Sequence, residues 1–175
     1  MDRKLYVSYG SNLNISKMKY RCPDAFIIGK GYIEDYELEF RRVANIAEHK
    51  GQKVPIVVWR ISERDEKALD RYEGISVGHY RKETIKVKID TFSELVNVLE
   101  ESILPEEVYA MVYIMNVENR PIEQPDPSYY HEIYIGYRDH NLEIRSLAVA
   151  AIKCDMKFPE YMAMEKYYYG IEGRG

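Results

Sequence analysis

Residues 54–61 form a near-continuous apolar run, Val-Pro-Ile-Val-Val-Trp-Arg-Ile. A run of this length predicts a strand buried on both faces, at the centre of a sheet. Residues 36–41 alternate apolar and charged side chains, which is the period-two pattern of a half-buried strand. Residues 49–52, His-Lys-Gly-Gln, predict a turn before the central strand. We expect further strands at residues 4–9, 25–33, 36–42, 80–90 and 108–115.

Helices are expected between and after these strands. Asn14 is placed to cap a short helix that ends at Arg21, just before a proline. Ser62 begins a second helix, and Gly74 stands where a C′ glycine would end it. Further helices are predicted at residues 92–103, 128–140 and 142–154, and in the tyrosine-rich tail. Regular βαβ alternation is lacking, which indicates an α+β protein with a curled or closed sheet and helices outside it.

The composition limits the partners of the protein. The 175 residues suit one domain, and 46% hydrophobic residues can build a core. The net charge of −4 argues against nucleic acid or an anionic membrane as the main partner, because both select a basic excess. The apolar stretches are too short to span a bilayer, the start lacks a signal-peptide pattern, and the two cysteines lie far apart. We therefore expect a cytoplasmic protein with reduced thiols.

Tyrosine is unusually frequent, with 17 tyrosines against 4 phenylalanines and 1 tryptophan. A buried tyrosine hides its ring but still needs a partner for its hydroxyl. Most of these residues could fill the core and the surface in the ordinary way. The alternative is that several hydroxyls line a polar cavity.

Two segments carry side chains that could bind or react. Gly10 follows the first strand and permits a sharp turn and the close approach of a ligand. Ser11 and Asn12 come next, before a helix whose first N–H groups could bind a carboxylate. Glu73 ends the second helix, where the helix dipole would raise its pKa toward that of a general acid or base, and Asp70 shares its face. The ordinary alternatives are a capped turn and a solvated surface glutamate.

The sequence has no pattern for a metal or a cofactor. His49, His79, His131 and His140 lack ligand spacing, and we interpret all four as structural or surface residues. Walker A, GxGxxG and GxSxG motifs are absent as well. Phosphate transfer, dinucleotide binding and hydrolase-elbow chemistry therefore lack support.

Four segments, taken in order, resemble the γ-glutamylcyclotransferase family and its AIG2-like members. They are Tyr-Gly-Ser-Asn-Leu at residues 9–13, Val-Pro-Ile-Val-Val-Trp at 54–59, Leu-Asp-Arg-Tyr-Glu-Gly at 69–74 followed by Tyr-Arg at 80–81, and Pro-Ser-Tyr at 127–129 followed by Gly-Tyr-Arg at 136–138. The resemblance runs from about residue 4 to residue 154. It implies a small mixed barrel with flanking helices around one polar cavity. It also implies an enzyme that cyclises a γ-glutamyl group to 5-oxoproline and releases an amine or amino acid, a reaction that needs no metal or cofactor.

The same resemblance assigns roles by position. Glu73 matches the catalytic carboxylate of the family. The positions implied to bind a small γ-glutamyl substrate are Tyr6, Tyr9, Gly10, Ser11, Asn12 and Tyr129. Tyr80 and Tyr113 match further aromatic positions of the cavity.

The chain departs from the family pattern in two places. Residues 90–107 are longer than the usual hairpin and form an insertion, and residues 155–175 form a divergent tail. We expect one cyclotransferase-like domain over residues 1–175, and the leaving amine and the choice between a monomer and a homodimer stay open. One alternative to the enzyme is a non-catalytic protein that binds a small carboxylate on the same fold. The other is a nucleic-acid binder that uses tyrosine stacking, which the lack of a basic face disfavours.

Overall fold

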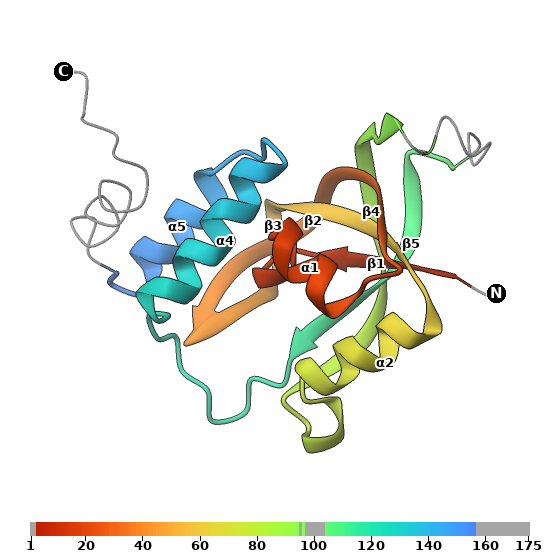
Figure 1. The fold of residues 1–175 in the computed structure, drawn as a ribbon. Helices are drawn as coiled ribbons and strands as arrows, with labels where there is room; N and C mark the ends of the chain where they lie inside the picture. The colour runs from red at the N-terminus through yellow and green to blue at the C-terminus, as the bar shows by residue number, and fades with distance from the viewer. Residues whose placement is uncertain (1–2, 95, 97–103, 157–175) are drawn as a thin grey trace.

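The computed structural model describes residues 3–94, 96 and 104–156 (Figure 1). The strands are β1 (Lys4–Ser8), β2 (Phe26–Arg41), β3 (Val43–Ile61), β4 (Tyr80–Phe92) and β5 (Glu107–Met115). The helices are α1 (Ile15–Arg21), α2 (Glu63–Tyr72), α4 (Pro127–Asp139) and α5 (Arg145–Lys153), with the short 3-10 helices η1 (Ser11–Leu13) and η2 (Ile75–Val77). The helix expected at residues 92–103 and the tyrosine-rich tail lie largely outside the described residues.

The five strands close into a barrel in the order β1-β3-β2-β4-β5. Four neighbouring pairs are antiparallel, and β1 closes the barrel against β5 in parallel, with Tyr6 opposite Met111. Strand β3 carries the apolar run and is paired along both edges, by β1 and by β2. Helices α4 and α5 lie together beside β2 and β3, and α2 lies on another side of the barrel (Figure 1). The predicted α+β class and the curled, mixed sheet are confirmed.

The long hairpin of β2 and β3 corrects two local predictions. The strands expected at residues 25–33 and 36–42 are one strand, and the turn expected at residues 49–52 lies within β3. The ladder stays paired on both sides of Asp35, so residues 49–52 bulge opposite this one residue. Asp35 has a positive φ of 59°, and its carboxylate accepts a hydrogen bond from Gly51 N at 2.8 Å. Turn-forming residues therefore bend the ladder here without ending it.

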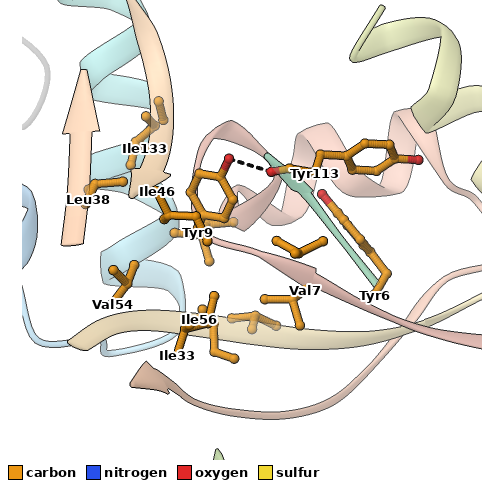
Figure 2. Packing of buried hydrophobic residues seen from close by; sticks show 14 of the residues in the cluster. Tyr6, Val7, Tyr9, Ile33, Leu38, Ile46, Val54, Ile56, Tyr113 and Ile133 are labelled. Atoms are coloured by element: carbon orange, nitrogen blue, oxygen red, sulfur yellow. Dashed lines mark hydrogen bonds between the residues drawn. The ribbon is translucent and has the colours of Figure 1, made fainter. Parts of the chain in front are cut away.

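The hydrophobic core fills the barrel and the space under α4 and α5. Figure 2 shows part of it, with buried side chains from three strands and from α4, namely Val7, Ile33, Leu38, Ile46, Val54, Ile56 and Ile133. Helix α4 comes close to η1 at Gly136, where a Cβ atom would lie 2.5 Å from the Cβ of Leu13. Because Gly136 has no side chain, α4 can pack directly on the segment that follows β1. This packing holds the segment in place.

Candidate functional site

Helix α2 presents Glu73 at its carboxyl end. Its start is fixed by a capping box, in which Ser62 Oγ accepts from Asp65 N at 3.2 Å and Asp65 Oδ2 accepts from Ser62 N at 3.0 Å. Its end is fixed by Gly74, which adopts the left-handed conformation at φ 66°. Glu73 is the C-cap residue of α2, and its N–H donates to Leu69 O at 2.8 Å. Both predicted ends of the helix are confirmed, and the backbone of Glu73 is held at a defined place.

The chain leaves β1 through Tyr9 and Gly10 and turns at once into η1. Asn14 ends this turn and caps α1 as predicted, since its Oδ1 accepts from Lys17 N at 3.1 Å. A Cβ atom at Gly10 would lie 3.2 Å from the Cβ of Ala44 and 3.8 Å from the hydroxyl of Tyr129. The backbone at Gly10 therefore lies against a wall of the site, with little room for a side chain.

A cavity of about 260 Å³ opens between this turn, the end of α2 and the barrel wall. All nine side chains or backbone positions that the sequence singled out line it, namely Tyr6, Tyr9, Gly10, Ser11, Asn12, Glu73, Tyr80, Tyr113 and Tyr129. The other lining residues are Val7, Val43, Ala44, Tyr72, His79 and Arg120. Residues far apart in the chain, from Tyr6 to Tyr129, thus meet in one polar pocket.

Asn12 connects two side chains that line the cavity, Tyr6 and Glu73, with Arg21 beside it. Its Nδ2 donates to the Tyr6 hydroxyl at 2.8 Å and to Glu73 Oε1 at 3.1 Å. Its Oδ1 accepts from Arg21, the last residue of α1. The Arg21 guanidinium also donates to Ser11 Oγ at 3.2 Å and stacks on the Tyr72 ring with its carbon 3.5 Å from the ring centroid. Hydrogen bonds therefore fix both the nitrogen and the oxygen of the Asn12 amide.

Most tyrosine hydroxyls of the cavity are committed to the protein. Tyr9 donates to Tyr113 O at 2.7 Å, as Figure 2 shows, and Tyr80 donates to Ala44 O at 2.7 Å. Tyr113 donates to Asp70 Oδ1 at 2.8 Å. Six of the 17 tyrosines line this one cavity, so the interpretation of a polar, tyrosine-lined cavity is confirmed for these six. Rings that bury apolar area while their hydroxyls bind fixed partners give a wall that is both stable and polar.

Burial raises the pKa of Glu73 to about 7. The nearby charge of Arg21 and the hydrogen bond from Asn12 oppose this shift, because both favour the carboxylate. The direction agrees with the expectation from the helix end, but removal from water is the larger cause. A carboxyl group with a pKa near neutrality can both accept and donate a proton at physiological pH.

Asp70 has a different part from Glu73, although the two share a face of α2. Its carboxylate binds the Tyr113 hydroxyl and forms an ion pair with Lys82 at 2.9 Å. Asp70 does not line the cavity and instead supports a residue that does. The structure therefore separates the two carboxylates into a supporting group and a group that faces the pocket.

Three residues of the site were not found from the sequence. Arg21 lies in the last turn of α1, where a basic residue is ordinary, so nothing distinguishes it before the fold is known. Arg120 belongs to the irregular segment between β5 and α4 and reaches the cavity by long-range packing. His79 was interpreted as structural or surface, and it is exposed yet lines the cavity mouth beside Tyr80.

Two further findings apply to the described residues, which are 3–94, 96 and 104–156. Within these residues no group of three or more His, Cys, Asp or Glu side chains is placed to hold a metal ion. Over the same residues, no helix has the length and apolar character needed to cross a bilayer.

Comparisons with known proteins agree on one family. A family model described as gamma-glutamyl cyclotransferase, AIG2-like, matches residues 6–132. The chain is 28% identical over 151 residues to a gamma-glutamylcyclotransferase of Mus musculus, covering 79% of this chain and 72% of that protein. It is also 28% identical over 153 residues to the Homo sapiens gamma-glutamylcyclotransferase, covering 80% and 73% of the two chains.

Solved structures resemble the fold of this chain. One is named gamma-glutamyl cyclotransferase, with a TM-score of 0.69 and 21% identity over 94% of this chain and 99% of the other. Another, from Homo sapiens and described as uncharacterized, has a TM-score of 0.68 and 24% identity over 86% and 87% of the two chains. At these identities the structures establish the shared fold and no more.

Proposed function

The chain belongs to the gamma-glutamyl cyclotransferase, AIG2-like family, and we propose that it cyclises the γ-glutamyl group of an amide to 5-oxoproline, with release of an amine or amino acid. We further propose that residues 1–175 form one such domain, with an insertion at residues 90–107 and a divergent tail at 155–175. The observation that carries the proposal is the placement of Glu73. It is a carboxyl group with a pKa near 7 at the wall of a small polar cavity.

The substrate brings its own nucleophile to this reaction. The α-amine of a γ-glutamyl amide attacks the γ-carbon of the same molecule, which closes a five-membered ring. Holding the substrate in a curled form therefore supplies much of the acceleration through orientation alone. A cavity of about 260 Å³ with rigid aromatic walls suits a small molecule held in one conformation.

Glu73 moves the protons in the proposed mechanism. The α-amine is an ammonium group in water, so one proton must be removed before the nitrogen can attack. That first proton passes to solvent. Glu73 in its carboxylate form then accepts the second proton from this nitrogen as the ring closes and, now as the acid, gives it to the departing nitrogen, so the ring nitrogen keeps one hydrogen. Asn12 holds one carboxylate oxygen at 3.1 Å, which leaves the other oxygen for the substrate.

The turn after β1 supports the substrate from the other side. The first N–H groups of a helix have no partner within it, so those near Gly10 and Ser11 can donate to a carbonyl or carboxylate oxygen of the substrate. Tyr9, Tyr129 and Tyr80 complete the wall around that place. Among the described residues no carboxylate pairs with the Arg120 guanidinium, which makes it a suitable group to attract a carboxylate of the substrate.

A substrate panel tests this function. The purified protein is incubated with γ-glutamyl amino acids and γ-glutamyl amines that differ only in the leaving amine, and 5-oxoproline release is measured. Turnover of one class supports the cyclotransferase and identifies its leaving group. Binding of these compounds without any 5-oxoproline would instead favour the alternative of a non-catalytic carboxylate-binding protein.

A further inference from the structure

The hydroxyl of Tyr6 differs from those of Tyr9, Tyr80 and Tyr113 in the same cavity. Tyr9, Tyr80 and Tyr113 each donate their hydroxyl hydrogen to a protein oxygen. The Tyr72 hydroxyl pairs with Ser11 Oγ at 3.3 Å, and the Tyr129 hydroxyl accepts from Ala44 N at 3.2 Å. Within the described residues, the hydroxyl of Tyr6 has one hydrogen-bond partner, the Asn12 amide nitrogen, and this partner is itself a donor.

The direction of that hydrogen bond is fixed by Arg21. If the Asn12 amide were rotated by half a turn, its NH₂ group would face the Arg21 guanidinium, which has only donors. Its oxygen would then face the carboxylate of Glu73, and both oxygens are acceptors. Only one orientation satisfies both neighbours, and in that orientation the Asn12 nitrogen donates to Tyr6. The oxygen of Tyr6 is thus an acceptor, and its own hydrogen is left without an acceptor in the described part of the protein.

The Tyr6 hydroxyl lies near Glu73, and Tyr6 lines the cavity. Tyr6 is only 3% exposed, yet it is one of the residues that line the pocket. The Tyr6 oxygen and Glu73 Oε1 bind the same Asn12 nitrogen, so they are at most about 6 Å apart. Two groups at such a spacing can contact two atoms bonded to the same carbon, one a nitrogen and the other an oxygen.

We propose that the Tyr6 hydroxyl is a catalytic residue that donates a hydrogen bond to the γ-carbonyl oxygen of the substrate while that oxygen becomes negatively charged. The proposal rests on the cyclotransferase function above and names a second group, beside Glu73, that touches the reacting atoms. Arg21 and Asn12 are positioning residues in this scheme, because they determine which way the Tyr6 hydrogen can point.

The step balances without an additional reactant. As the bond between the α-nitrogen and the γ-carbon forms, the π electrons of the carbonyl move onto its oxygen, and Tyr6 stabilises them without giving up its proton. Glu73 transfers the proton from the attacking to the departing nitrogen. The carbonyl then re-forms as the bond to the departing nitrogen breaks, and the hydrogen bond from Tyr6 weakens again.

The electrostatics of Tyr6 suit a donor that keeps its proton. Burial and the nearby charge of Glu73 raise the pKa of the Tyr6 hydroxyl well above its usual value. The group therefore stays protonated at neutral pH. Its ring is also fixed, because it packs edge-on against Tyr113 with the ring centroids 5.8 Å apart.

Tyr6→Phe tests the proposal, since it removes the hydroxyl and keeps the ring. We expect kcat to fall by roughly 10²-fold, which is the usual cost of losing one oxyanion donor, with KM and Tm nearly unchanged. Tyr137→Phe is the matched control, because Tyr137 is a fully buried tyrosine outside the cavity whose hydroxyl bonds to Ser146, and its kcat should equal that of the wild type. An unchanged kcat in Tyr6→Phe would overturn the proposal. A raised KM together with a lowered Tm would also overturn it, in favour of a structural role.

A second variant tests the orientation of the hydrogen. Arg21→Gln releases the Asn12 amide, so the Tyr6 hydrogen can turn to Asn12 Oδ1 and kcat should fall. In the Tyr6→Phe background the same change should have a much smaller effect, because the hydrogen it redirects is already gone. Fully additive losses would overturn the positioning role.

The same measurements separate this proposal from the function on which it rests. A wild type that releases 5-oxoproline, an inactive Glu73→Gln and a fully active Tyr6→Phe would refute the role of Tyr6 and leave the cyclotransferase standing. A wild type that releases no 5-oxoproline from any γ-glutamyl compound would refute both.

Discussion

Two cavities in the described part of the protein each have a glutamate in the wall, Glu73 in one and Glu37 in the other, and the two glutamates have different partners. The first is the cavity of about 260 Å³ that contains Glu73. The second, of about 490 Å³, lies between the β2–β3 hairpin and α5 and contains Glu37. The candidate active site is thus the smaller of these two cavities.

The two carboxylates have opposite surroundings. Glu37 Oε2 lies 2.7 Å from His49 Nδ1 and 2.5 Å from Lys153 Nζ, and it is partly open to water. Glu73 has an amide donor, Asn12, and no ion-pair partner within the described residues. Glu37 has two basic groups in contact with its carboxylate, whereas burial without a cation in contact raises the pKa of Glu73 to about 7. The comparison teaches that charge compensation, more than volume, distinguishes the candidate active site.

The largest effect should come from removing the two carboxylates in turn. Glu73→Gln keeps the shape and the hydrogen bond from Asn12 but cannot exchange a proton, so we expect turnover to fall by roughly 10²-fold or more. Glu37→Gln should leave turnover unchanged, because Glu37 lies in the other cavity. The measurement is kcat for 5-oxoproline release. A folded Glu73→Gln variant with wild-type kcat would contradict the mechanism, and a slow Glu37→Gln would break the contrast between the cavities.

A smaller effect is expected at the backbone wall of the first cavity. Gly10→Val puts a branched side chain where even a Cβ atom lies 3.2 Å from Ala44, and overpacking of this kind costs about 1–3 kcal/mol. Part of that cost should appear as an increase in KM of roughly tenfold, since 1.4 kcal/mol corresponds to a factor of ten. Gly10→Ala should give an intermediate value in the same steady-state assay. Wild-type kcat and KM in Gly10→Val would show that the substrate does not use this turn.

We also expect a modest difference in stability between the wild type and Glu73→Gln, and this difference should depend on pH. The pKa of Glu73 is raised to about 7 in the folded protein, against 4.5 for an ordinary glutamate. Between these values the folded state binds more protons than the unfolded chain, so the free energy of unfolding decreases as pH rises through this window. A glutamine at position 73 does not titrate, so the variant does not lose stability in this way as pH rises.

We therefore expect the Tm of Glu73→Gln, relative to the wild type, to be higher by a few degrees near pH 8 and closer to the wild type near pH 5. Thermal unfolding of both proteins in the same buffers gives the difference directly, and other titrating groups cancel in it. A Tm difference that does not change with pH would mean that burial does not perturb Glu73.

The last prediction is that removal of metal ions leaves the activity unchanged. Intramolecular cyclisation requires no Lewis acid, and a metal enzyme would need about three protein ligands around an open position. Release of 5-oxoproline should therefore survive dialysis against a strong chelator, and Mg²⁺, Mn²⁺ or Zn²⁺ should not increase it. Activity that is lost and then restored by one of these ions would recast Glu73 as a ligand.

Local signals in the sequence predicted the parts of the site that lie on single elements. The cap at Asn14, the capping box at Ser62 and the glycine at 74 depend on residues a few positions apart, and the structure confirms all three. The class of fold followed from the order of strands and helices. The family pattern pointed to Glu73 and the tyrosines, and the structure brings them together in one cavity.

The parts that escaped prediction depend on contacts between distant segments. Arg21 acquires its place only when α1 packs against the end of α2, and Arg120 reaches the cavity from an irregular segment. Residues 49–52 have the composition of a turn, but pairing on both sides of them keeps β3 continuous. Local preference was thus outweighed by the ladder with β2, which no short window of sequence contains.

The parallel contact that closes the barrel has a consequence for how the protein is made. Strand β1 is synthesised first, but its partners are β3 and, at the closing seam, β5. Loop-closure entropy makes such long-range pairing slow, so β1 must wait until residue 111 has emerged before the barrel can close. Tyr6 and Tyr113 lie on the two sides of this seam and meet only then. A chain that ends before β5 therefore lacks one wall of the cavity, and catalytic activity reports that the barrel has closed.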